Sequence, residues 1–162
     1  MVIDDIDTFL EHLIVGKPIL GIDYGTSYIG VAISSLNHNI AMPLKLLQCN
    51  KKQLQLKSIL SIISEHKICA IVMGMPINKD ASRSNQTNIT VEFTKNLVEK
   101  TDVPIFMQDE RYTSITANKL MFPDTIKQKS SSKKKSSYKK NDAIAAAIIL
   151  ETILAIKKIR QK

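Results

Sequence analysis

The chain has 162 residues, of which 44% are hydrophobic and 23% are charged, and its formal net charge is +8. This length and composition predict one folded domain over residues 1–162 with a substantial core. The apolar stretches are too short to span a membrane, and the acidic N-terminus lacks the basic region of a signal peptide. We therefore expect a cytoplasmic protein without membrane contact, in which Cys49 and Cys69 are reduced thiols.

The positive charge is concentrated in two segments. Residues 127–140 are rich in Ser and Lys and contain no acidic residue, and a second basic run lies at residues 157–162. Basic clusters beside a folded core favour a phosphate-rich partner such as nucleic acid, although a solvated loop or tail explains either cluster equally well. Because Ser and Lys bury little apolar area, residues 124–139 are expected to form a mobile basic loop.

The hydrophobic periodicity predicts a short helix within an N-terminal extension, residues 1–16, and then a core of strands and helices. In chain order, the predicted core elements are a strand at 18–24, a strand at 28–35, a strand at 41–48, a helix at 51–66, a strand at 68–73, a helix at 85–100, a strand at 103–107, a helix at 114–121 and a helix at 141–160. Three strands in a meander followed by alternating helices and strands predict an α/β fold. Its mixed five-stranded sheet should carry helices on both faces.

The most distinctive segment joins the first two strands of the core. An apolar run ends in Asp23, and the small residues Gly25, Thr26 and Ser27 follow as a turn. A carboxylate at the end of a buried strand is costly unless a positive charge, such as a divalent cation, compensates it. Asp and Gly are also common in ordinary turns, so this segment alone fits a plain hairpin equally well.

Two further carboxylates are expected at the same edge of the sheet. Glu110 follows the strand at 103–107, and carboxyl ends of parallel strands meet at one edge. Asp142 opens the last helix, and it shares a face with Ala145 and Ala146, which allow a close approach to the sheet. Simpler explanations remain open: Glu110 can pair with Arg111 at the surface, and Asp142 can interact with the helix dipole.

The candidate site is rich in oxygen ligands. His12, His38 and His66 fit no metal-binding spacing, whereas carboxylates are the ligands that Mg²⁺ or Mn²⁺ prefers. Two such ions can activate water and stabilise the leaving oxygen of a phosphodiester. The sequence therefore favours Mg²⁺ or Mn²⁺ over zinc at this edge.

Four sequence blocks together resemble one known family. They lie at residues 21–32, 72–80, 109–114 and 141–151, in the order typical of the YqgF family of pre-16S ribosomal RNA nucleases. The resemblance implies an RNase H-like, Holliday-junction-resolvase-like fold and a nuclease that acts on structured RNA or DNA in maturation of the small ribosomal subunit RNA. It further implies that Asp23, Glu110 and Asp142 are the catalytic and metal-binding residues.

Substrate contacts are expected from polar and basic residues around this edge. Arg83 suits a phosphate because its guanidinium presents a planar fork of donors. The full predicted set of substrate-binding residues is Thr26, Asn78, Asp80, Arg83, Arg111, Lys133, Lys134 and Lys135. The chain departs from the family pattern at Ala81, where glycine is common, and at Ser27-Tyr28, where a basic residue is frequent.

Three other functions are compatible with parts of the sequence. The turn after Asp23 is similar to the phosphate-binding strand pair of actin-like ATPases, but those proteins clamp a nucleotide between two such domains. A catalytically silent RNA-binding assembly factor for the small ribosomal subunit precursor would keep the fold and the basic loop. A true junction resolvase would need a symmetric dimer, whereas this sequence shows no dimerisation seam and predicts a monomer or weak dimer.

Overall fold

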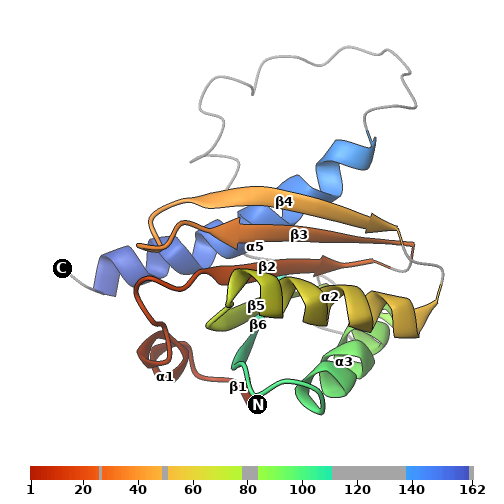
Figure 1. Cartoon of the computed structure of the whole chain (residues 1–162), viewed down its shortest axis with the longest axis horizontal. Helices are drawn as coiled ribbons and strands as arrows, with labels where there is room; N and C mark the ends of the chain where they lie inside the picture. The colour runs from red at the N-terminus through yellow and green to blue at the C-terminus, as the bar shows by residue number, and fades with distance from the viewer. Residues whose placement is uncertain (26, 49–50, 78–83, 111–137, 161–162) are drawn as a thin grey trace.

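The computed structural model describes residues 1–25, 27–48, 51–77, 84–110 and 138–160 (Figure 1). Its centre is a six-stranded sheet with the order β1-β6-β5-β2-β3-β4. The strands are β1 (Val2–Ile3), β2 (Ile19–Tyr24), β3 (Tyr28–Ser34), β4 (Ala41–Gln48), β5 (Ala70–Met75) and β6 (Ile105–Asp109). The α/β fold with a mixed sheet is confirmed.

The sheet has one strand more than the five predicted. The additional strand, β1, has two residues and pairs in parallel with β6 through Val2–Ile105 and Ile3–Phe106. The backbone N–H of Ile105 also donates to the carbonyl of Met1 at 2.9 Å. Two residues are too few to show an alternating pattern, so this strand carries no periodic signal in the sequence.

The predicted meander and the parallel strands are both present. β3 runs antiparallel to β2 and to β4, whereas β2, β5 and β6 are parallel to one another. The carboxyl ends of β2, β5 and β6 therefore meet at one edge of the sheet, which we call the carboxyl edge. In an open α/β sheet this is the edge where function is expected.

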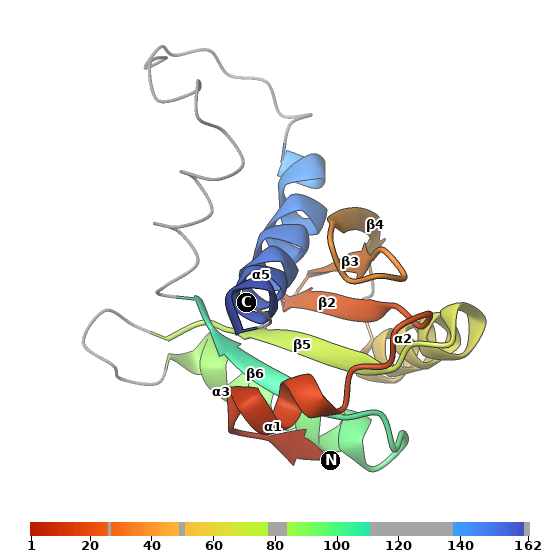
Figure 2. The same ribbon diagram turned by 90° about the vertical axis from the view of Figure 1, so that its left-hand side faces the viewer.

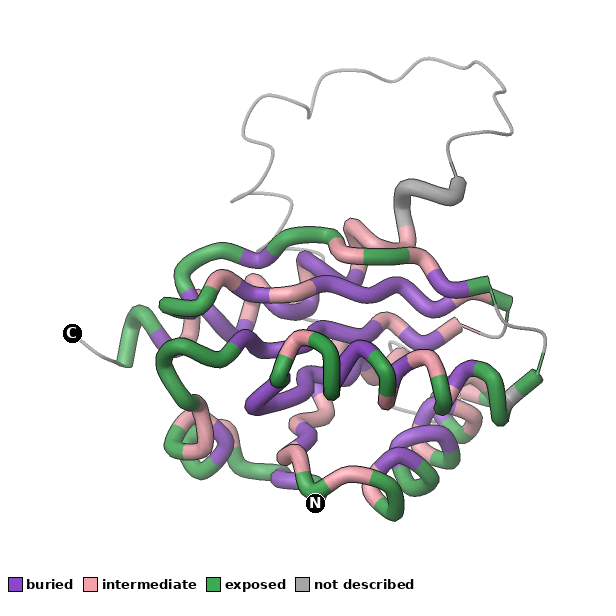
Figure 3. Tube along the Cα trace, in the orientation of Figure 1, coloured by how far each residue is buried: buried purple, intermediate pink, exposed green. Residues whose placement is uncertain are grey.

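Helices cover both faces of the sheet, as predicted (Figures 1 and 2). One face carries α2 (Lys52–His66) and α3 (Asn85–Val98), and the other carries α1 (Ile6–Glu11) and α5 (Tyr138–Arg160). Successive side chains of β2 divide between two hydrophobic clusters, because Leu20 and Ile22 face α2 and α3 whereas Ile19 belongs to the α1 and α5 side. The strands at the centre of the sheet are consequently buried on both faces (Figure 3).

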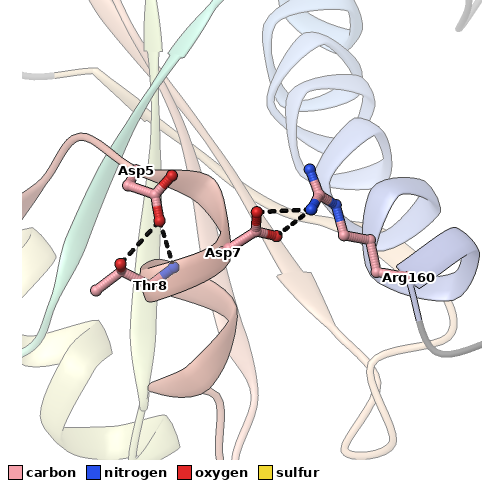
Figure 4. Close-up of polar contacts among 4 residues, drawn as sticks. All are labelled: Asp5, Asp7, Thr8 and Arg160. Atoms are coloured by element: carbon pink, nitrogen blue, oxygen red, sulfur yellow. Dashed lines mark hydrogen bonds and ion pairs between the residues drawn. The ribbon is translucent and has the colours of Figure 1, made fainter.

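Several predicted boundaries shift by a few residues. α5 begins at Tyr138, so the last two residues assigned to the loop at 124–139 are helical. The rest of that loop, and the helix predicted at 114–121, lie outside the described residues. α1 begins after Asp5, which caps it by accepting from the backbone N–H of Thr8 at 2.7 Å, and it ends at Glu11 with His12 as its C-cap (Figure 4). No described helix is both long enough and apolar enough to cross a membrane.

The two helices on the α5 face are linked at the surface. The guanidinium of Arg160, in the last turn of α5, contacts the Asp7 carboxylate of α1 at 2.6 Å (Figure 4). Both side chains are half exposed, so the pair contributes at most about 1 kcal/mol. It nevertheless connects the N-terminal extension to the helix that carries Asp142.

Candidate active site at the carboxyl edge of the sheet

Asp23 lies near the carboxyl end of β2 and faces α5. Its neighbour two residues earlier, Gly21, has the same orientation, and a Cβ atom added there would lie 2.8 Å from the carbonyl oxygen of Ala146 in α5. Across the sheet, Asp23 pairs with Gly30 of β3. On β5, the position adjacent to Asp23 is Gly74, one residue beyond the Ile22–Met73 pair. Asp23 therefore lies between two glycines.

Because Gly30 has no side chain, α5 packs closely against the sheet beside Asp23. A Cβ atom at this position would collide with the carbonyl oxygen of Asp142 and would lie 2.5 Å from its carbonyl carbon. No side chain fits between the strand and the helix there. The close approach brings Asp142 next to Asp23, and both line a hollow of about 230 Å³ together with Gly25, Ser27 and Tyr28.

Gly74 gives the corresponding space to Glu110 on the other side of Asp23. Glu110 follows β6, the strand next to β5, and its carboxyl group lies over Gly74. A Cβ atom at Gly74 would collide with Oε1 of Glu110 and would lie 3.3 Å from its Cδ. In the row Gly30–Asp23–Gly74, Asp23 thus contributes a carboxylate from the sheet itself. Asp142 lies on the Gly30 side of Asp23, and Glu110 lies on the Gly74 side.

Burial and charge repulsion raise the pKa values of Asp23 and Glu110. Desolvation by burial, followed by the negative charge of Asp142, raises the pKa of Asp23 to about 6. Desolvation also raises the pKa of Glu110 to about 7, with further contributions from the charges of Asp23 and Asp109. Carboxylates that are held together against their repulsion are typical of sites that bind a cation or transfer a proton.

The three carboxylates fit a divalent cation by their chemistry. All of them offer hard oxygen donors, and Asp23 interacts electrostatically with both of the others. Within the described ranges, no three acidic, histidine or cysteine side chains are close enough together to form a complete metal-binding cluster. The arrangement is instead two pairs that share Asp23, namely Asp23 with Asp142 and Asp23 with Glu110.

The strand end that carries Asp23 is held from the opposite face of the sheet. The carbonyl of Tyr24 accepts from the side-chain amide of Gln86, in the first turn of α3, at 2.6 Å. The Tyr24 hydroxyl donates to Oε1 of Gln55 in α2 at 2.7 Å, and its ring stacks on Phe93 with centroids 4.2 Å apart. No sequence pattern marks these supporting residues, because Gln86 and Gln55 belong to no motif and act through long-range contacts.

The first turn of α3 also holds the end of β5. Ser84 and Thr87 form a capping box, in which Ser84 Oγ accepts from the Thr87 backbone N–H at 3.0 Å. The hydroxyl of Thr87, which is fully buried, donates to the carbonyl of Pro76 just after β5. One helix terminus is therefore bonded to the ends of the two central parallel strands.

A second hollow lies on the face away from the carboxylates. It has a volume of about 240 Å³ and lies between α2 and α3, with Tyr24, Leu56, Ile89 and Phe93 among its lining residues. None of the predicted catalytic residues lines it. It is as large as the hollow beside Asp23, but its walls are mainly apolar, and its two carboxylates, Glu92 and Glu99, come from α3 and the C-terminal cap of α3.

All of the predicted substrate-binding residues lie outside the described part of the chain. These are Thr26, Asn78, Asp80, Arg83, Arg111, Lys133, Lys134 and Lys135. Their roles stay predictions. Ser27 and Tyr28, which the sequence marked only as a departure from a family pattern, line the hollow beside Asp23 and Asp142.

Comparisons with known proteins identify the family of the chain. Residues 17–156 match the model of the family RuvX, described as Holliday junction resolvase. A protein of Rickettsia felis named "Putative pre-16S rRNA nuclease" is 38% identical over 155 residues, which cover 95% of this chain and 96% of the relative. A protein of Rickettsia canadensis with the same name is 37% identical over 154 residues and has the same coverage.

Solved structures with this fold include two resolvases. Thermus thermophilus RuvC in complex with a Holliday junction substrate has a TM-score of 0.56 at 13% identity, covering 88% of this chain and 96% of RuvC. The yeast mitochondrial Holliday junction resolvase Ydc2 has a TM-score of 0.55 at 11% identity, covering 92% and 82%. Both likenesses concern the fold. The family match over residues 17–156 and the Rickettsia relatives show that the chain belongs to the RuvX family, described as Holliday junction resolvase, and is a nuclease, a hydrolase of phosphodiester bonds.

Proposed function

We propose that this nuclease uses a divalent metal ion to cleave ribosomal RNA precursors, at the 5′ end of pre-16S RNA, with Asp23, Glu110 and Asp142 as its catalytic residues. The observation that carries the proposal is the row Gly30–Asp23–Gly74, where the backbone of Asp142 packs on Gly30, the carboxyl group of Glu110 lies over Gly74, and both residues interact electrostatically with Asp23. The name of the Rickettsia relatives supports RNA as the substrate class. Reaction in the cytoplasm is consistent with Cys69, a buried free thiol.

Asp23, Asp142 and Glu110 are the residues that would hold Mg²⁺ or Mn²⁺. When bound, such an ion supplies a Lewis acid for the phosphoryl oxygen and lowers the pKa of a water molecule. The chain itself contributes the desolvation that makes a cation favourable here, because burial and like charge both oppose the ionised carboxylates. Without a cation, Glu110 holds a proton part of the time near neutral pH, since its pKa is about 7.

Binding of the phosphate backbone is assigned to the basic residues of the predicted substrate-binding set. We expect Arg83 and Arg111 to contact phosphates, with Thr26, Asn78 and Asp80 at the margin of the site. Lys133, Lys134 and Lys135 precede the helix that carries Asp142, so their charge would attract the polyanion to the same edge. This set supports nucleic acid as the partner, including the small ribosomal subunit precursor.

A cleavage assay tests the proposal directly. The purified chain is incubated with an RNA that contains the 5′ end of pre-16S RNA, in Mg²⁺, in Mn²⁺ and in a chelator. We expect cleavage only with metal, and a loss of at least about 1000-fold in Asp23→Asn. The matched control is Asp7→Asn, which removes a surface carboxylate on α1 and should leave cleavage unchanged.

The same assay separates the alternative functions. Binding of the RNA without cleavage under any metal condition would indicate an assembly factor and contradict the proposal. Junction resolution is the second candidate, favoured by the family match, and a four-way DNA junction is therefore included as a substrate. Paired symmetric cuts in this junction, with no cleavage of the RNA, would identify a resolvase that acts as a dimer.

A further inference from the structure

Tyr28 differs from the four aromatic residues that form ring pairs in the core. Phe9 packs on Phe106 with ring centroids 5.3 Å apart, and Tyr24 stacks on Phe93 at 4.2 Å. Each of these two pairs is built into one of the hydrophobic clusters of the core. Tyr28 belongs to neither pair and lines the hollow beside the carboxylates. Packing within the core therefore does not explain why an aromatic residue is present at this position.

The position of Tyr28 is fixed by the sheet. It is the first residue of β3 and pairs with Gln48 of the edge strand β4. It precedes Gly30 by two residues and therefore faces α5, on the same side as Asp23, which pairs with Gly30. Tyr28 is consequently a diagonal neighbour of Asp23, one step further out toward the carboxyl edge. Its side chain is only partly buried.

The turn before Tyr28 holds its backbone and leaves space beside it. The backbone N–H of Gly25 donates to the carbonyl of Tyr28 at 2.9 Å, and a Cβ atom at Gly25 would lie 2.6 Å from that oxygen. Gly25 and Ser27 line the same hollow as Tyr28 and have almost no side chain. A flat group can therefore enter the hollow next to a ring whose backbone is already fixed.

We propose that Tyr28 is a specificity-determining residue that stacks on an unpaired nucleobase next to the scissile phosphate. The inference rests on the proposed nuclease function, since the phosphate is assigned to the carboxylates that share the hollow with Tyr28. Every base presents a π face, so the contact selects an unstacked nucleotide without selecting its sequence. The favoured substrates are single-stranded segments, bulges and branch points, whose bases are free to leave the helical stack.

The test combines protein variants with substrates that lack one base. Once the cleavage site is mapped, the nucleotides beside the scissile phosphate are replaced in turn by abasic ones. On the normal substrate we expect Tyr28→Ala to lower kcat/KM by about 5- to 100-fold, whereas Tyr28→Phe, which keeps the ring, stays within about threefold. On one of the abasic substrates, wild type and Tyr28→Ala should be equal.

Two controls keep the result specific. Met42→Ala removes an exposed side chain from the other end of β4 and should leave kcat/KM unchanged on every substrate. The melting temperature of each variant reports whether the fold is intact. Equal losses in Tyr28→Phe and Tyr28→Ala would assign the effect to the hydroxyl group and overturn the stacking proposal. A loss in Tyr28→Ala that persists on every abasic substrate would also overturn it.

Failure of the proposed function would be recognised separately. If the wild-type chain cleaves no substrate, the affinity for a fluorescent single-stranded oligonucleotide is compared with that for its fully abasic counterpart. Stacking predicts that removing the bases weakens binding to wild type more than to Tyr28→Ala. Equal weakening of both proteins would overturn the stacking role, whatever the chain does to the phosphodiester bond.

Discussion

Near the carboxyl edge, the two faces of the sheet are built from side chains of different size. Toward α2 and α3, the central strands present large residues such as Ile22 and Met73, both fully buried. Toward α5, the adjacent positions on these strands are Asp23 and Gly74, and Gly30 lies across from Asp23. Large side chains hold a helix away from a sheet, whereas glycine lets the backbone of α5 and a carboxyl group come into contact with it. The α5 face, where the side chains are smaller, is therefore the one on which carboxylates can lie close together.

The largest effect should come from filling the space at Gly30. Gly30→Ala places a methyl group against the backbone of Asp142, which cannot move without shifting α5. We expect a loss of about 1–3 kcal/mol in the free energy of unfolding, as for other overpacked sites. Cleavage should be lost even under conditions in which the variant is folded, because Asp142 is displaced from Asp23.

The adjacent residue provides the matched comparison on the other face. Val31→Ala removes buried volume from the cluster formed with α2 and α3, and it should cost a similar free energy of unfolding. Its folded fraction should retain cleavage, because no carboxylate moves. Denaturant unfolding measures both stabilities, and the RNA assay measures both activities. If the two variants lose activity equally at equal folded fraction, a change on the α2 and α3 face disturbs the carboxylates as much as one on the α5 face, and the contrast between the faces is wrong.

The pH dependence of stability should show the charge gathered on the α5 face. The folded-state pKa values of Asp23, about 6, and Glu110, about 7, lie above those of the unfolded chain. Between about pH 4 and 7 the folded state therefore binds more protons than the unfolded state, and stability falls as the pH rises. The fall should be on the order of 3 kcal/mol for each group, at about 1.4 kcal/mol for each pH unit of pKa change.

The variant Glu110→Gln separates the contribution of Glu110 from that of groups whose contribution to stability changes with pH in the opposite direction. Burial lowers the pKa of His38, so protonation of this residue destabilises the fold and its contribution rises with pH. Comparing wild type with Glu110→Gln removes this common background. The difference in melting temperature should grow from pH 5 to pH 8, with the variant more stable at pH 8. A constant difference across this range would show that Glu110 carries no raised pKa.

Sequence patterns located the carboxylates better than they located what holds them. Asp23 and Glu110 follow apolar runs whose parallel pairing could be anticipated. For Asp142 the useful signal was the neighbouring alanines that allow close packing, because this residue lies in the second turn of α5 and does not open the helix, which begins at Tyr138. Gln86 carries no such mark, because a single hydrogen bond to Tyr24 depends on how α3 is placed against the sheet. The same is true of β1, since a strand of two residues is defined by its partner β6 and by no periodicity of its own.

The smallest effect is expected from a variant on the α2 and α3 face, which tests whether contacts on that face help to position Asp23 on the other. Gln86→Ala removes the hydrogen bond to the carbonyl of Tyr24, the residue that follows Asp23. The expected cost in the free energy of unfolding is about 1 kcal/mol, because one buried acceptor loses its partner. Since the end of β2 becomes looser, kcat should fall by about tenfold while KM for the RNA stays unchanged.

Gln55→Ala is the matched control, because it removes a bond to the Tyr24 hydroxyl and leaves the backbone contact intact. It should lower stability by a similar amount and change kcat by less than about threefold. The split between kcat and KM distinguishes positioning of Asp23 from a general loss of folded protein, which would lower the apparent enzyme concentration in both variants alike. Equal reductions of kcat in Gln86→Ala and Gln55→Ala would show that the two faces are not coupled through the backbone of β2.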